Sequence, residues 1–68
     1  MIAKRWYFTF GFDHKYRKGY VEVFAEDSEA ARNKMVERYG MEWGFQYNED
    51  EFREQPSKYG LYRVTVIP

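Results

Sequence analysis

The sequence contains no cysteine, one histidine, two serines and two prolines. Without cysteine, no disulfide can reinforce the fold, and no cysteine-ligated zinc or iron–sulfur site can form. A chain of 68 residues without disulfides is typical of a reducing compartment, so we expect a cytoplasmic protein. No segment approaches the roughly 18 apolar residues of a membrane-spanning helix, and the N-terminus lacks an apolar signal stretch. We therefore expect no membrane contact.

Groups that carry out catalysis are equally scarce. Ser28 and Ser57 stand at a predicted helix start and in a predicted turn, where serine bonds the backbone. His14 has no nucleophile at a recognisable spacing, and one histidine does not make a metal site. The five glycines are dispersed, so there is no phosphate-binding loop. The sequence predicts a protein that is not an enzyme and that holds no metal or other cofactor.

Neither sign of charge dominates the chain. Eleven Lys and Arg balance eleven Asp and Glu, so the formal net charge is zero. Proteins that bind nucleic acids without sequence preference rely on a global positive field, which this chain lacks. The charges are nevertheless sorted, because basic residues gather over 14–18 and acidic residues over 26–29 and 49–54. We expect a dipolar molecule with one basic end.

Aromatic side chains are the feature that the chain has in excess. Fifteen of the 68 residues are Phe, Trp or Tyr. A chain of this length forms one domain, residues 1–68, and buries only about 60% of its unfolded surface. Fifteen aromatic side chains exceed what so small an interior can hide, and aromatic residues dominate interfaces. We therefore expect a surface that meets a second copy or another protein.

Four segments show the period-two alternation of β-strands. They are residues 3–11, 19–25, 42–47 and 61–67. The loop over 12–18 joins the first two, which predicts an antiparallel hairpin. Gly44 inside the third segment indicates a bulge or a close backbone approach.

The middle of the chain carries the signals of an α-helix: a capping residue at its start, an apolar face along its length and a glycine at its end. Asp27 or Ser28 can cap its start, and Gly40 can end it. Apolar side chains between these residues fall on one helix face. The pattern predicts the main helix of the domain.

A shorter helix is predicted after the third strand. Asn48 and Glu51 resemble a capping box, which starts a helix over 49–55 that Pro56 ends. The fold class is therefore α+β with the order ββαβαβ. We expect a small mixed or antiparallel sheet with the main helix packed on one face.

The strand pattern assigns side chains to two sheet faces. The face opposite the main helix would carry Tyr7, Thr9, Tyr20, Glu22, Phe24, Arg63, Thr65 and Ile67. We expect a homodimer that forms through this face or through a sheet edge, because exposed aromatic patches mark interaction sites. Its contact residues would be Tyr7, Tyr20, Phe24, Arg63 and Ile67. Coverage of this face by the short second helix or the C-terminal residues stays open as an alternative.

The first hairpin loop combines basic and aromatic residues. They are His14, Lys15, Tyr16, Arg17 and Lys18. Loops on rigid strands often carry recognition, so we expect this loop to contact an acidic surface of a protein partner. The alternative is a nucleic-acid-binding accessory protein that uses residues 12–20, with bases stacked on tyrosines. Zero net charge disfavours that alternative, and a merely solvated loop also remains open.

A set of motifs runs through nearly the whole chain. It comprises Phe8-Thr9-Phe10-Gly11, His14, Gly19-Tyr20-Val21, Glu29-Ala30-Ala31-Arg32 with Met35, Tyr39-Gly40 with Trp43, Phe45-Gln46-Tyr47, Phe52 and Tyr59-Gly60-Leu61. This set resembles small proteins that phages and integrated mobile elements of Gram-positive bacteria carry. The resemblance implies a phage or prophage origin, a compact α+β domain and the host cytoplasm as location. Short phage proteins of this kind often inhibit host defences stoichiometrically. We therefore expect a dimeric binding protein that inhibits a host anti-phage defence protein.

Overall fold

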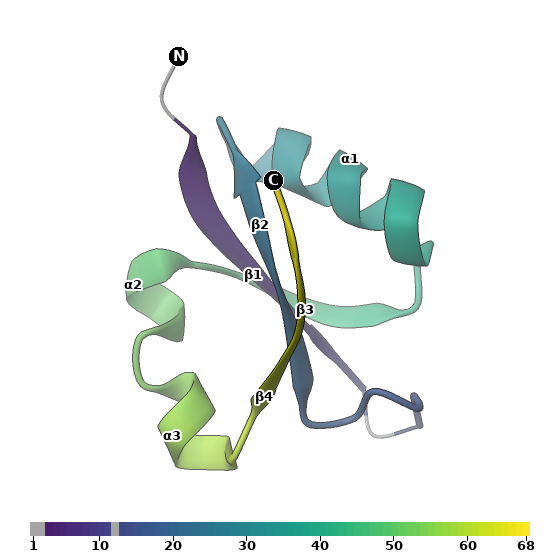
Figure 1. The fold of residues 1–68 in the computed structure, drawn as a ribbon, viewed down its shortest axis with the longest axis vertical. Helices are drawn as coiled ribbons and strands as arrows, with labels where there is room; N and C mark the ends of the chain where they lie inside the picture. Colours follow the sequence, from purple (N-terminus) through teal and green to yellow (C-terminus); the bar gives the residue numbers. More distant parts are fainter. Residues whose placement is uncertain (1–2, 12) are drawn as a thin grey trace.

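The protein folds as a four-stranded sheet with helices on both faces (Figure 1). A computed structural model describes residues 3–11 and 13–68. Phe12, at the start of the predicted loop, lies outside the described residues. Element types follow the predicted order ββαβαβ, with the second helical segment divided in two. The predicted α+β class is confirmed.

The sheet is mixed and has the strand order β3-β1-β2-β4. The central pair, β1 (Lys4–Phe10) and β2 (Gly19–Ala25), forms the predicted antiparallel hairpin. On one side, β3 (Trp43–Asn48) runs antiparallel to β1; on the other, β4 (Tyr62–Ile67) runs parallel to β2. The strands β3 and β4 are therefore the two edges of the sheet.

The longest helix, α1 (Ser28–Tyr39), covers one face of the sheet (Figure 1). Its first turn is capped by Asp27, whose side chain accepts a hydrogen bond from the Ala30 N–H at 2.8 Å. Gly40, with φ of 71°, ends the helix, and its N–H donates to the Val36 carbonyl. Both predicted signals are confirmed, since glycine adopts positive φ without strain.

The core lies between α1 and the central hairpin. Phe8, Val21, Val23 and Met35 are fully buried there. The three strand residues alternate along β1 and β2, so their side chains point to the same face of the sheet. Burial of these apolar side chains is the main source of stability.

The second helical segment forms α2 (Glu49–Phe52) and α3 (Gln55–Tyr59). The predicted capping box at its start is confirmed, because Asn48 and Glu51 exchange hydrogen bonds of 2.7 and 2.9 Å. The prediction that Pro56 ends the helix is wrong. Pro56 lies in the first turn of α3, where a missing N–H leaves no helical hydrogen bond unmade.

The pairing of β3 with β1 contains the bulge that Gly44 predicts. Thr9 pairs with Phe45, whereas Phe10 pairs with Trp43, so Gly44 has no opposite residue. A Cβ at Gly44 would lie 3.4 Å from the Gly11 nitrogen. Glycine therefore suits both the extra residue and the close approach of the two strands.

A second register shift occurs where β4 pairs with β2. Tyr20 pairs with Arg63 and Val21 with Thr65, so Val64 is an extra residue in β4. An extra residue exchanges the two faces of a strand from that point onward.

This shift corrects the assignment of the β4 side chains. Ile67 pairs with Val23 and packs against the core beneath α1, whereas Val66 pairs with Glu22. The prediction that Thr65 and Ile67 lie opposite the main helix is wrong. Simple alternation counts every residue once and cannot detect an inserted one.

Candidate functional site

The sheet face opposite α1 is partly covered by α2. Phe52 is only 3% exposed, and its ring stacks on Tyr7 with centroids 4.4 Å apart and an interplanar angle of 9°. The same ring meets Tyr20 edge-on at 5.0 Å. Coverage by the short helix, left open by the sequence, is what the structure shows. Tyr7 and Tyr20 thus pack within the molecule rather than forming an open patch.

The Tyr7 hydroxyl lies in a partly buried, electronegative environment. The pKa of Tyr7 is raised to about 12, chiefly by burial and next by the Glu22 carboxylate, which favours the protonated hydroxyl through a hydrogen bond and its charge. Glu22 faces Tyr7 directly across the β1–β2 pair. The Arg5 charge acts in the opposite direction. The phenol therefore stays neutral and serves packing.

The other residues predicted for self-association do not join Tyr7 and Tyr20 in one patch. Phe24 is half-buried, and the Arg5 guanidinium lies 5.8 Å from the centre of its ring. Arg63 is exposed at the start of β4. Ile67 lies on the α1 side of the sheet. These five residues are thus distributed over both faces.

His14 and Tyr16 anchor the hairpin loop instead of extending into solvent. The His14 ring stacks on Phe10 with centroids 4.5 Å apart. Its Nδ1 accepts a hydrogen bond from the Tyr16 N–H at 3.0 Å, and its Nε2 lies 3.2 Å from a Glu42 carboxylate oxygen. The accepting Nδ1 assigns the proton of a neutral ring to Nε2, which then donates to Glu42. His14 therefore stabilises the loop through its contacts with Phe10, Tyr16 and Glu42.

Three cations of the loop remain free for contact. Lys15, Arg17 and Lys18 are exposed, and no ion pair involves them within residues 3–11 and 13–68. Lys18 has φ of 66°, a left-handed conformation that non-glycine residues seldom adopt. Such strained residues cluster at functional sites. The loop thus presents a basic tip, defined here as Lys15, Arg17 and Lys18.

An aromatic groove opens beside this basic tip. It has a volume of about 440 Å3 and is lined by Thr9, Phe10, Gly11, Lys18, Phe45, Tyr47, Gln55, Tyr59 and Leu61. Phe45 is 68% exposed and Tyr59 is 55% exposed, so two large apolar side chains are open to water on one concave surface. Lys18 belongs to both the groove and the tip, so apolar and cationic surfaces adjoin.

No pattern in the sequence predicts the aromatic groove. The alternation of Phe45 and Tyr47 predicts a strand, but the predicted second helix ends at Pro56 and does not include Tyr59. The groove forms because α3 carries Tyr59 to a place beside the end of β1 and the middle of β3. A signal for this helix is Pro56 itself, because proline is favoured in the first turn of a helix.

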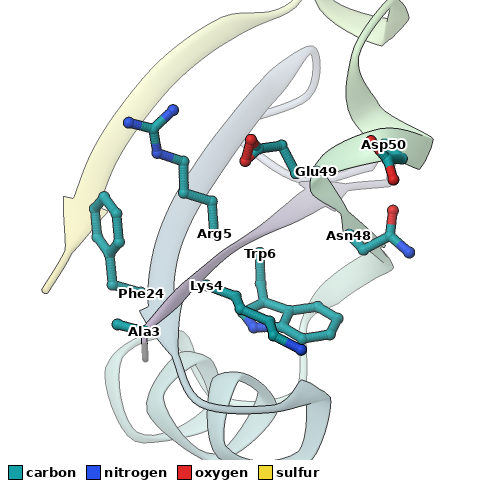
Figure 2. A pocket seen from close by; sticks show the side chains of 8 residues that line it. All are labelled: Ala3, Lys4, Arg5, Trp6, Phe24, Asn48, Glu49 and Asp50. Carbon is teal, nitrogen blue, oxygen red and sulfur yellow. The ribbon is translucent and has the colours of Figure 1, made fainter. Parts of the chain in front are cut away.

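A second hollow, of about 680 Å3, lies at the opposite end of β1. Figure 2 shows Arg5 and Phe24 on one side and Glu49 and Asp50, from the start of α2, on the other. Lys4, Trp6 and Asn48 contribute to its wall. Charges of both signs surround it, so it selects neither an anion nor a cation.

The chain was compared with known protein families, curated proteins and solved structures. No family model, no curated protein and no solved structure matches it. Among the described residues, no three His, Cys, Asp or Glu side chains gather as metal ligands. None of the helices in that part of the chain is long and apolar enough to cross a membrane. The exposed groove and its basic tip are the features with a recognisable binding character.

Proposed function

We propose that this chain is a small binding protein that engages a partner protein through the aromatic groove. The carrying observation is the exposure of Phe45 and Tyr59, at 68% and 55%, on the walls of one concave surface. Aromatic side chains are enriched at the buried centres of protein interfaces. An apolar side chain of the partner that enters this groove would remove both rings from water.

The charge around the groove defines the partner segment further. Lys18 lines the groove, and Lys15 and Arg17 extend the positive surface along the loop. Complementary charge steers association and fixes the register of a bound segment. The partner segment is therefore an apolar anchor flanked by acidic residues.

The resemblance to small phage proteins supplies the setting of the proposal. A protein of this kind would occupy a functional surface of a host defence protein and inhibit it by simple exclusion. Stoichiometric inhibition requires a binding surface and no catalytic group, which agrees with the scarcity of such groups in the sequence.

Nucleic-acid binding by the same loop is less well supported. Tyr16 packs against Phe10 and Tyr39, and Phe52 covers Tyr7 and Tyr20. Single-strand binders require aromatic faces that are open to the bases. Because these contacts cover the aromatic faces, they favour a protein partner. The exposed cations would then affect its association rate.

Capture from a lysate of a Gram-positive bacterial host tests the proposal with matched variants. Tyr59→Glu places a charge in the groove, whereas Tyr62→Glu changes a tyrosine of similar exposure, 49%, that does not line it. The wild type and Tyr62→Glu should capture the same host protein, and Tyr59→Glu should capture at least tenfold less of it. The purified host protein should bind the wild type in a one-to-one ratio. Equal capture by all three chains would refute the role of the groove.

Salt dependence separates the protein partner from nucleic acid. About three phosphate contacts would give single-stranded DNA binding a log–log salt slope of roughly −2 to −3. Binding of the captured protein should depend less steeply on salt, since rim charges mainly affect the association rate. Replacement of Lys15, Arg17 and Lys18 by Glu should weaken capture. Single-stranded DNA binding that exceeds protein binding and disappears in this variant would favour the nucleic-acid alternative.

A further inference from the structure

The edge strand β3 is unprotected against pairing with another strand. Among the described residues, it is bonded to β1 on one side and to no strand on the other. Its sequence, Trp-Gly-Phe-Gln-Tyr-Asn, contains no charged residue and no proline, although 32% of the chain is charged. Natural sheets guard their edges with lysine, proline or inward-pointing charges. Apart from the Gly44 bulge near its start, β3 has none of these devices.

Apolar side chains flank this edge on both faces. Phe45 and Met41 are the two most exposed large hydrophobic residues described, at 68% and 64%. Phe45 lies on the groove face, whereas Met41 and Val36 line a hollow beside α1 together with Gln46. A strand added to β3 would cover apolar surface on either side of the sheet.

We infer that β3 pairs antiparallel with β3 of a second copy, about a two-fold axis at Gln46. This register places Phe45 of each copy opposite Tyr47 of the other, on the same face of a continuous eight-stranded sheet. Directly opposed aromatic residues stabilise antiparallel pairs. Two-fold dimers are the commonest homo-oligomers, and the same neutral edge serves both partners of such a pair.

Charge complementarity supports a second copy as the occupant. The hollow beside β3 carries Glu29 and Arg32 on the exposed side of α1. Because Gln46 lines this hollow, a two-fold axis at Gln46 brings two copies of the same mixed-charge surface together, and each copy offers one carboxylate and one guanidinium to the other. The opposite edge, β4, is less suited to pairing, because Arg63 is exposed near its start and Pro68, which has no N–H, follows its end.

The inferred dimer has a consequence for partner binding, which rests on the proposed function of the groove. The axis of an antiparallel edge pair is perpendicular to the sheet, so both grooves lie on the same side. Phe45 and Tyr47, which line each groove, also form the seam. The dimer would therefore present two grooves together and bind a two-fold target with enhanced avidity.

Cysteine cross-linking tests the axis directly, because the natural chain contains no cysteine. Facing residues of an antiparallel pair have Cα atoms about 4.5 to 5.5 Å apart, which suits a disulfide. Gln46→Cys should form a disulfide-linked dimer under mild oxidation. Thr65→Cys, the matched control on β4, should form little. Equal or greater cross-linking at Thr65 would overturn the inference.

Light scattering at tens of micromolar, a concentration chosen from the micromolar affinity range, provides the second test. Gln46→Lys sets two like charges against each other at the axis and should weaken the dimer at least tenfold. Thr65→Lys should remain dimeric, with unchanged circular dichroism in both variants. A monomeric wild type, or a monomer only for Thr65→Lys, would refute the dimer.

The two proposals fail independently of each other. Gln46 lies on the α1 face, where its side chain donates a hydrogen bond to the Ser28 carbonyl, and the groove lies on the opposite face. A Gln46→Lys monomer should therefore still capture the host protein that Tyr59→Glu loses. A variant that loses dimerisation but still captures the host protein has lost only the pairing of β3. A variant that loses capture but remains dimeric has lost only the function of the groove.

Discussion

Phe52 is expected to hold the second helical segment on the sheet almost alone. It is the one buried residue of α2, and α3 has none. Its ring contacts Tyr7, Tyr20 and Tyr47 at centroid distances of 4.4 to 5.5 Å. Substitution Phe52→Ala removes these contacts, and such truncations of buried phenylalanine reduce the free energy of unfolding by about 3 to 5 kcal/mol.

The loss should be large relative to the stability of so small a domain. At about 0.05 to 0.15 kcal/mol per residue, a chain of 68 residues has a free energy of unfolding of roughly 3 to 10 kcal/mol. Since 1 kcal/mol shifts the melting temperature of a domain this size by about 4 to 8 °C, Phe52→Ala should lower it by more than about 10 °C. Phe45→Ala, a matched change at an exposed phenylalanine, should alter the stability of the Gln46→Lys monomer by less than about 0.5 kcal/mol, because the monomer has no seam that includes Phe45.

Thermal and urea unfolding, followed by circular dichroism, measure both variants. Phe52→Ala should also expose Tyr7 and Tyr20, so binding of an environment-sensitive hydrophobic dye should increase before global unfolding. Equal melting temperatures for Phe52→Ala and Phe45→Ala would refute the packing of α2 on this face. A large loss for Phe45→Ala would refute the exposed groove wall.

Substitutions at three further positions give separable outcomes. The raised pKa of Tyr7, about 12 against 10 when unfolded, stabilises the neutral folded form, so stability should be lost as pH rises through 10 to 12. Tyr7→Phe should flatten this loss in urea titrations, and an unchanged profile would contradict the assignment. Lys18→Gly should raise the free energy of unfolding by about 0.5 to 1 kcal/mol by relieving its positive φ, and a lower urea midpoint would contradict this. His14→Ala should lower stability by about 1 to 2 kcal/mol because the Tyr16 N–H loses its acceptor. His14→Asn, which can accept the same bond, should recover part of that loss, and equal losses would point to the Phe10 stack instead.

Local signals in the sequence are enough to predict several of the helices and strands. The cap at Asp27, the glycine after Tyr39 and the capping box at Asn48 all act within four residues along the chain. The same holds for the alternation in the first hairpin, whose strands are neighbours in sequence. Local hydrogen bonds and short periodicities can be recognised without knowing which distant segments meet.

Which surfaces are covered and which remain open depends on contacts between distant segments of the chain. Ile67 changed faces because Val64 is inserted in β4, and an inserted residue is defined only by the partner strand. Phe52 closed over Tyr7 and Tyr20, and Tyr59 formed the groove with Phe45, through contacts between segments more than ten residues apart. Aromatic side chains pack equally well in a core, a groove or an interface. Their role depends on the strand order and on the placement of α2 and α3, which no local pattern specifies.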